Sequence, residues 1–266
     1  MQMKISLVIL STLLFSLPPL AQGEEPVVFG VMDIDFPPYQ YIVNGTQAGP
    51  DADIISEVFR RLDEYNLTYK LRPVKRVALE IKNGNIDITA VFKTPEREKF
   101  ALFTHTPIHW SIYKIAVMKG NEFAFNRIED LYGKRLGMMM GNKISLEFDR
   151  AVESGKIDLL RVPSFTKTLL LLKNQRVKAI VGSATITHHL ASKLGMADWL
   201  VMLPHPIRPP KAFRFMISKN STLVDPQHLR NRLEDTLAQM LKDGTFDKIY
   251  ANHGLTFERN ARSEQP

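Results

Sequence analysis

The chain has 266 residues, with 35 lysines and arginines, 28 aspartates and glutamates, a formal net charge of +7 and no cysteine. Without cysteine it forms no disulfide, which excludes a small disulfide-stapled scaffold and favours a compact α/β body. Its basic residues are scattered in pairs and form no long run, so we expect a solvated surface for most of them and no nucleic-acid partner.

The first 23 residues have the pattern of a secretory signal peptide. Lys4 supplies a basic start, residues 5–17 form an uncharged and mostly apolar run, and two prolines end it. The small residues of Ala21-Gln22-Gly23 then make a cleavage site. The run is shorter than the roughly 20 apolar residues that a membrane-spanning helix needs. We therefore expect an exported, soluble chain that resides in the periplasm.

The first half of the remaining chain alternates strands and helices. Apolar patterns predict strands at 27–31, 69–71 and 86–91, and helices at 52–62 and 77–81. A proline-rich loop, DIDFPPYQY, follows the first strand, and the dipeptide Asn44-Gly45 marks a turn. Strands that alternate with helices favour a mostly parallel sheet.

The second half repeats this alternation. Strands are expected at 115–118, 135–139 and 177–181, and helices at 146–152, 168–173 and 184–193. A long helix begins at Asp225-Pro226 and ends at Gly244, and a short helix follows it. The segments IKNGNIDITAV and LKNQRVKAIVG share one pattern, which hints at two lobes of the same plan. Residues 258–266 are polar, and we expect a flexible tail there.

Arg97 is an unusual residue for its position. The segment FKTPERE predicts a short helix with Thr94 as its N-cap and Pro95 as its first residue. The amino end of a helix carries partial positive charge and favours acidic side chains, so a guanidinium there needs a reason. One reason is an anion bound from outside the chain. The alternative is a solvated arginine that pairs with Glu96 or Glu98.

Six segments, taken in order, resemble the extracellular solute-binding proteins of family 3, the polar amino-acid-binding components of ABC importers. They cover nearly the whole mature chain: FPPYQY, GPDADIISEVFRRL, IKNGNIDITAVFKTPEREKFALFT, DLYGKRLGMMMGN, RVKAIVG and LKDGTFDKIYANHG. The resemblance implies a two-lobed fold of the type II periplasmic binding proteins. Lobe 1 would comprise 24–114 and 215–257, and lobe 2 would comprise 115–214. Hinge strands near 113–118 and 214–218 would let the lobes close on a ligand in the cleft between them.

The resemblance also implies a role for Arg97, which matches the family's arginine that pairs with the ligand's carboxylate. The chain departs from the family pattern at three places. Phe92 replaces a serine or threonine, Gly141-Asn142-Lys143 replaces a Gly-Ser/Thr-Thr segment, and Ser183 replaces the aspartate that holds the ligand's ammonium. An ordinary α-amino acid would therefore bury a poorly paired ammonium, so the ligand is expected to be more acidic or to lack the amine.

Four further residues are candidates for the ligand site. Phe36 has the family position of an aromatic that covers the ligand, whereas Trp110 fits the cleft wall and the ordinary core equally well. Asp33 would meet a cationic group or cap its turn. Arg76 lies in the first turn of a cleft-facing helix in the family, although solvated surface is the favoured interpretation of its charge.

The sequence favours a binding protein without cofactor or metal. No HExxH-type pairing, GxSxG motif or phosphate-loop spacing is present. We expect a monomer that captures a small carboxylated solute and reaches the membrane only through the permease of an ABC importer. Two alternatives stay open. One is a dehydratase-like enzyme on the same fold, with Asp33 as the suspected acid. The other is an exported sensor that reports its ligand to a membrane partner.

The signal peptide gives the first testable prediction. Mature protein from the periplasm should begin at Glu24, or at Gln22 if cleavage follows Ala21, because both sites follow small residues. N-terminal sequencing of the exported fraction checks this. An exported chain that still begins at Met1 would contradict it.

Overall fold

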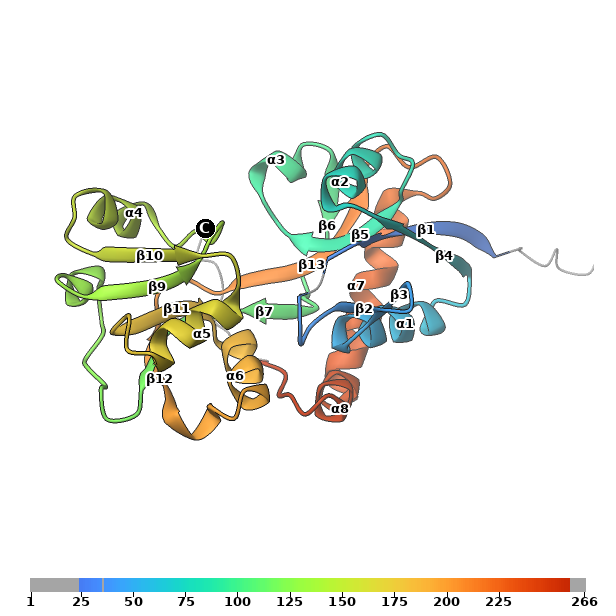
Figure 1. Cartoon of the computed structure of the whole chain (residues 1–266). Coiled ribbons are helices and arrows are strands. Elements are labelled where there is room, and N and C mark those ends of the chain that lie inside the picture. Colours follow the sequence, from blue (N-terminus) through green and yellow to red (C-terminus); the bar gives the residue numbers. More distant parts are fainter. Residues whose placement is uncertain (1–23, 35, 259–266) are drawn as a thin grey trace, which may run out of the picture.

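The structure, a computed structural model, describes residues 24–34 and 36–258. The predicted signal peptide and nearly all of the predicted tail lie outside the described residues. Figure 1 shows two α/β bodies, which we call lobe 1 and lobe 2. Each is built on its own sheet, and this confirms the two-lobed α/β fold class expected from the sequence. Within the described part of the chain, no helix is long and apolar enough to span a bilayer.

Lobe 1 is built on a six-stranded sheet. Its strands lie in the order β4 (Tyr65–Arg72), β1 (Glu25–Met32), β5 (Ile88–Phe92), β13 (Lys211–Ser218) and β6 (Ala101–Phe103), and β7 (His109–Ser111) also pairs with β13. β1 runs parallel to β4 and β5, whereas β13 runs antiparallel to its neighbours. The lobe adds the hairpin β2 (Tyr41–Val43) and β3 (Thr46–Ala48), and the helices α1 (Pro50–Arg61), α2 (Val74–Lys82), α3 (Pro95–Glu98), α7 (Pro226–Lys242) and α8 (Thr245–Asn252).

Lobe 2 is built on a five-stranded sheet. Its strands lie in the order β10 (Asp158–Val162), β9 (Arg135–Met139), β11 (Ala179–Ser183), β8 (Tyr113–Met118) and β12 (Leu200–Pro206). β9 is parallel to β10 and β11, and β8 is antiparallel to β11 and β12. The helical elements are α4 (Leu146–Glu153), α5 (Phe165–Lys173), α6 (Ala184–Lys193), and the short 3-10 helices η1 (Ile128–Leu131) and η2 (Ala197–Trp199).

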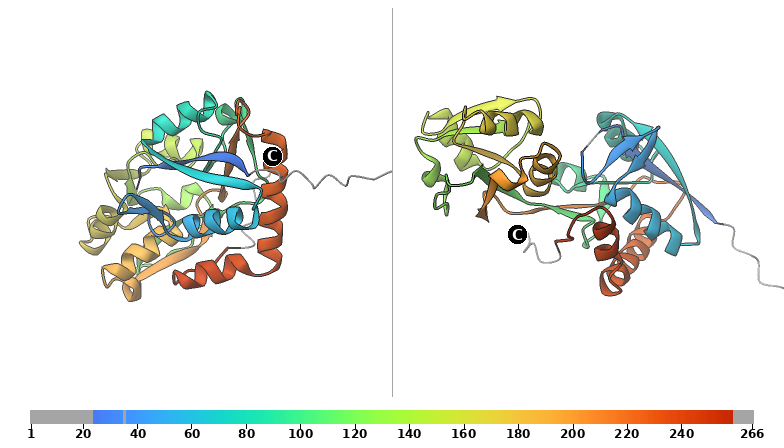
Figure 2. Two further views of the ribbon diagram at one scale, coloured as in Figure 1. Left: turned by 90° about the vertical axis from the view of Figure 1, so that its right-hand side faces the viewer. Right: turned by 60° about the horizontal axis from the view of Figure 1, so that its bottom comes forward.

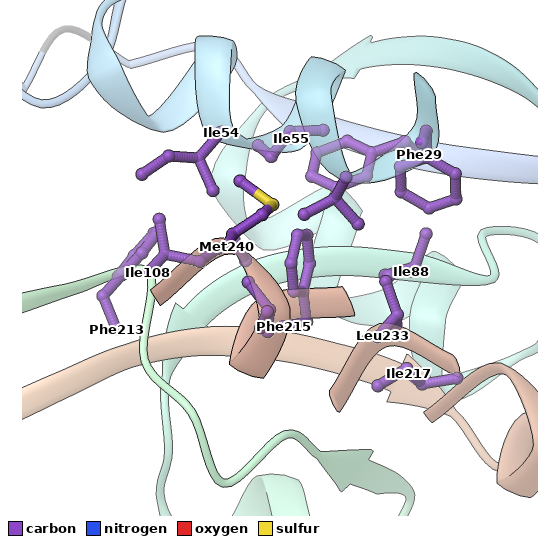
Figure 3. Packing of buried hydrophobic residues seen from close by; sticks show 14 of the residues in the cluster. Phe29, Ile54, Ile55, Ile88, Ile108, Phe213, Phe215, Ile217, Leu233 and Met240 are labelled. Atoms are coloured by element: carbon purple, nitrogen blue, oxygen red, sulfur yellow. The ribbon is translucent and has the colours of Figure 1, made fainter. Parts of the chain in front are cut away.

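Apolar packing on one face of the lobe 1 sheet forms the larger core. Figure 3 shows Phe29 and Phe215 of the sheet packed together with Ile54 and Ile55 of helix α1. Helix α7 adds Leu233 and Met240 to the same core. The apolar stripe of α7 is fully buried, with no exposed surface at Leu229, Leu233, Leu237 and Met240. Burying such side chains stabilises a fold by about 1.5–3 kcal/mol each. This core holds rigid the strands whose ends carry the candidate site.

The chain crosses between the sheets twice, through two short adjacent segments. The first crossing is Ile112, between β7 in lobe 1 and β8 in lobe 2. The second comprises residues 207–210, between β12 and β13. The right-hand view of Figure 2 shows the two bodies with these connections between them. The family resemblance implies lobe boundaries after residues 114 and 214, whereas strand pairing places both crossings a few residues earlier. Apolar patterns in the sequence predict strands at these places, but they do not show which sheet each strand joins.

The glycine of the turn after α2 gives a test of how lobe 1 packs. Gly84 has φ +78°, and a Cβ there would lie 2.0 Å from the backbone oxygen of Asn220. Left-handed backbone costs an alanine about 1–2 kcal/mol, and the clash should add about 1–3 kcal/mol. We therefore expect Gly84→Ala to destabilise the protein strongly in urea-induced unfolding.

Gly120 provides the matched control, because it has φ +88° and an added Cβ would meet nothing within 4 Å. Gly120→Ala should show only the backbone cost. Equal destabilisation by the two substitutions would mean that the contact between the α2 turn and the segment after β13 is not as tight as described.

Candidate functional site

Most of the candidate residues lie where strands of the two sheets end. Asp33 and Phe36 follow β1, and Phe92 is the last residue of β5. Asn142 and Lys143 follow β9, and Ser183 is the last residue of β11. Ligands of open α/β sheets bind outside the carboxyl ends of the strands. The topology therefore gathers these side chains at the edges where a ligand is expected.

Arg97 lies in the short helix that the sequence predicted. Thr94 is the N-cap, and its side chain accepts a hydrogen bond from the Arg97 backbone N–H at 3.4 Å. The guanidinium donates to the carbonyl oxygen of Phe92 at 2.5 Å. Glu98, one of the two surface partners considered for it, pairs instead with Lys93 at 2.6 Å. Among the described residues Arg97 makes no ion pair, and burial lowers its pKa.

Phe92 belongs to an aromatic stack that sequence reasoning missed. Its ring meets Phe213 edge-on at 5.2 Å, and Phe213 stacks on His109 at 4.5 Å. His109 stacks on its other side against Tyr39 at 3.9 Å. His109 lies in β7, and this short strand pairs with β13 so that His109 stands opposite Phe213.

The buried histidine of this stack is paired with a buried acid. Nδ1 of His109 lies 2.9 Å from Oδ1 of Asp51, and both side chains are almost wholly buried. Asp51 lies in the first turn of α1, where the helix dipole favours a carboxylate. Asp51 is recognisable in the sequence as an acid of the segment GPDAD, at the start of a helix. Its pairing with His109 is not, because that residue lies 58 positions away.

Tyr39 joins this stack to lobe 2. Its hydroxyl donates to the carbonyl oxygen of Trp110 at 3.2 Å, and its ring belongs to a buried apolar cluster that also contains Ile186 of α6. Burial raises the pKa of Tyr39 far above its usual range. Phe36 stacks on the outer side of Tyr39 at 6.3 Å and is half-buried. The structure thus brings Phe36, Phe92 and Trp110 close to one aromatic cluster at the junction of the lobes.

A second group of polar side chains lies at the carboxyl edge of the lobe 2 sheet, and we call it the Tyr113 cluster. It comprises Tyr113, Asn142, Ser183 and Arg208. The Tyr113 hydroxyl donates to the side-chain oxygen of Asn142 at 3.0 Å. Ser183 lies directly opposite Tyr113 in the strand pairing, and the Arg208 guanidinium lies 4.1 Å from the centre of the Tyr113 ring. The sequence suggests Asn142 and Ser183, but neither Tyr113 nor Arg208.

Three candidates are not drawn into these clusters by any contact that the structure describes. Asp33 and Lys143 are exposed. Arg76, on α2, pairs with Glu80 at 2.7 Å and is also largely exposed. Glu80 also forms an ion pair with Arg72 at 3.5 Å, so this is a local network of the α2 surface. No group of three or more histidine, aspartate and glutamate side chains able to hold a metal is found in the described part of the chain.

Comparison with known proteins points to one family. Residues 29–256 match the bacterial extracellular solute-binding proteins, family 3. The probable amino-acid-binding protein YxeM of Bacillus subtilis (strain 168) is 27% identical over 230 residues, which are 84% of this chain and 83% of that protein. The probable amino-acid ABC transporter extracellular-binding protein ytmK from Bacillus subtilis has a TM-score of 0.70 at 22% identity, over 86% of this chain and 97% of its own.

A histidine kinase sensor domain with similarity to periplasmic binding proteins has the same fold. Its TM-score is 0.63 at 19% identity, over 89% of this chain and 99% of its own. At this level of identity the two solved structures show a common two-lobed architecture and nothing about what is bound.

The Asp51–His109 pair gives a prediction on stability. Asp51→Ala should lower the free energy of unfolding by about 3 kcal/mol, because it leaves a buried imidazole without its partner. Asp158→Ala is the control, since Asp158 pairs with Arg135 at a similar 2.7 Å but on an exposed surface. That change should cost less than about 1 kcal/mol. Urea-induced unfolding measures both, and similar losses would contradict the structural role of the buried pair.

Proposed function

Because the chain belongs to the family 3 bacterial extracellular solute-binding proteins, we propose that it captures a small carboxylate-bearing solute in the periplasm for an ABC importer. The solute would bind where the carboxyl edges of the two sheets carry Arg97 and the Tyr113 cluster. The amino-acid binding named for YxeM, and the ABC transport named for ytmK, support this class of ligand and partner.

The observation that carries the proposal is the half-buried guanidinium of Arg97. A buried cation is costly unless an anion or several acceptors compensate it, and here one backbone carbonyl does so. The planar fork of the guanidinium matches the two oxygens of a carboxylate. A bound carboxylate would supply the missing partner. Phe36 and Phe92 would cover the apolar part of the solute.

Binding would work through the two short crossings between the lobes. The solute would contact Arg97 of lobe 1 and the Tyr113 cluster of lobe 2. It would therefore stabilise the arrangement of the two lobes in which both groups reach it. Such differential affinity shifts the population of lobe arrangements without any chemical step. The permease would then recognise the loaded form.

The two alternatives lead to different measurements. The fold shared with a sensor domain favours the sensor alternative as the second candidate. Deleting the gene should reduce cellular uptake of the solute if the protein serves transport, and should leave uptake unchanged if it serves sensing. The enzyme alternative would use Asp33, which is exposed. Turnover of a bound acid by the purified protein would support that alternative.

The test of the proposal begins with identification of the solute that co-purifies with the protein, by mass spectrometry. Calorimetry with that solute should then show at least a tenfold loss of affinity, about 1.4 kcal/mol, for Arg97→Lys. Lysine keeps the charge but loses the two-pronged contact. Arg97→Ala should lose more.

Arg127→Ala serves as the control, because Arg127 is an exposed arginine of lobe 2. It should leave the affinity unchanged. The melting temperature of the unliganded protein should also stay close to wild type in both Arg97 variants. Unchanged affinity together with a lower melting temperature in Arg97→Ala would mean that Arg97 serves stability and that the proposed site is wrong.

A further inference from the structure

The Tyr113 cluster contains three buried polar atoms that have no hydrogen-bond partner in the described part of the chain. They are the side-chain nitrogen of Asn142, the hydroxyl of Ser183 and the Nε of Arg208. Ser183 has no exposed surface, and Arg208 keeps only 9% of its surface exposed. Buried polar atoms are almost always paired, so three orphans in one cluster need an explanation. All three can donate a hydrogen bond, and together they call for an acceptor.

The local structure explains why the three donors lie together. Ser183 pairs with Tyr113 across neighbouring strands, so both side chains stand on the same face of the sheet. The oxygen of Asn142 accepts from the Tyr113 hydroxyl, which leaves its nitrogen as the free end. Arg208 is held over the same ring because the Ile207 backbone N–H donates to the Tyr113 carbonyl oxygen at 2.9 Å.

The charge of this cluster is not balanced by the protein. Arg208 makes no ion pair with a described carboxylate, and its polar contacts are Tyr113 and the Pro209 carbonyl oxygen. Burial lowers its pKa, as it does for Arg97. By contrast, the partly buried Arg61 pairs with both Glu57 and Asp243. Ser183 also precedes α6, whose first turn contains no acid and carries the partial positive charge of a helix start.

We propose that the Tyr113 cluster is a second anion subsite, and that the solute therefore carries two anionic groups and no obligatory ammonium. This rests on the function proposed above, because the first anionic group is the carboxylate at Arg97. The second group would accept hydrogen bonds from Arg208, Ser183 and Asn142. A dicarboxylate or a carboxylate with a phosphonate-like second group has the required chemistry. Arg208 and Tyr113 would then determine specificity, since they select against solutes whose second end is neutral or cationic.

Calorimetry with defined probes tests the subsite. Unbranched α,ω-dicarboxylates from malonate to adipate are compared with monocarboxylates of the same chain length and with ω-phosphonocarboxylates. At least one doubly anionic probe should bind 100-fold or more tightly than its matched monocarboxylate. Which of the two series binds better identifies the second group.

Variants then locate the effect. Arg208→Gln should weaken the preferred doubly anionic probe at least tenfold, and should change the affinity for the matched monocarboxylate less than threefold. Ser183→Ala should act in the same direction but more weakly. Because it removes only one oxygen atom, it also tests the subsite in case the Arg208 variant does not fold. Ser183→Asp should abolish the preference, because it adds a negative charge to the cluster. Arg127→Gln is the exposed control and should leave every affinity unchanged.

The outcomes separate the two proposals. Loss of binding in Arg97→Ala with unchanged binding in both Arg208→Gln and Ser183→Ala would overturn the second subsite and leave the proposed function standing. Equal affinity of the wild-type protein for dicarboxylates and monocarboxylates would do the same. If Arg97→Ala changes no affinity, and the solute that co-purifies has no carboxylate, the proposed function itself fails.

Discussion

The structure depends on a two-stranded antiparallel ribbon that continues from one sheet into the other. In lobe 1, Ser111 pairs with Lys211, and in lobe 2, Lys114 pairs with Pro206. Between them, the Ile207 N–H donates to the Tyr113 carbonyl oxygen, so the two crossings stay in contact. Such a ribbon can bend and twist but cannot separate. It therefore limits how the lobes move relative to each other, and it keeps the residues beside it in register.

Arg97 and Arg208, two arginines that make no ion pair within the described part of the chain, lie on or beside this ribbon. Phe92, whose carbonyl holds Arg97, pairs with Phe213 of the ribbon, and Arg208 belongs to the ribbon itself. The buried Asp51–His109 pair is fixed there too, between the rings of Tyr39 and Phe213. A rigid aromatic foundation beneath half-buried or buried arginines without an ion pair would preorganise the proposed binding site, because the side chains would need little further ordering when a ligand arrives.

Local signals in the sequence were sufficient for much of the fold. The strand at Arg135–Met139, the helix at Ala184–Lys193 and the Thr94-Pro95 start of α3 follow from apolar periodicity and capping residues. The edge strands β10 and β12 were not predicted, because short apolar runs such as their DLLRV and LVML do not by themselves distinguish a strand from a helix or loop segment. The pairing of His109 with Phe213 joins residues far apart in the chain. In the site, the family resemblance pointed to Arg97, Asn142 and Ser183. Arg208 and Tyr113 were not predicted, because their contact joins residues far apart in the chain. In addition, the segment PIRPP around Arg208 has the proline-rich pattern of a loop.

The order of segments along the chain has a consequence for how the protein acquires its structure. Lobe 2 is one continuous stretch, whereas the lobe 1 sheet has β13 between β5 and β6, and β13 follows all of lobe 2 in the sequence. When the chain is synthesised from its amino terminus, the sheet of lobe 1 stays incomplete until residue 218 has been added. Lobe 2 has all its strands before then. Long-range pairing of this kind slows folding, because the loop must close before the contacts form. The smaller lobe can therefore assemble first, and the larger one is completed around its two ends.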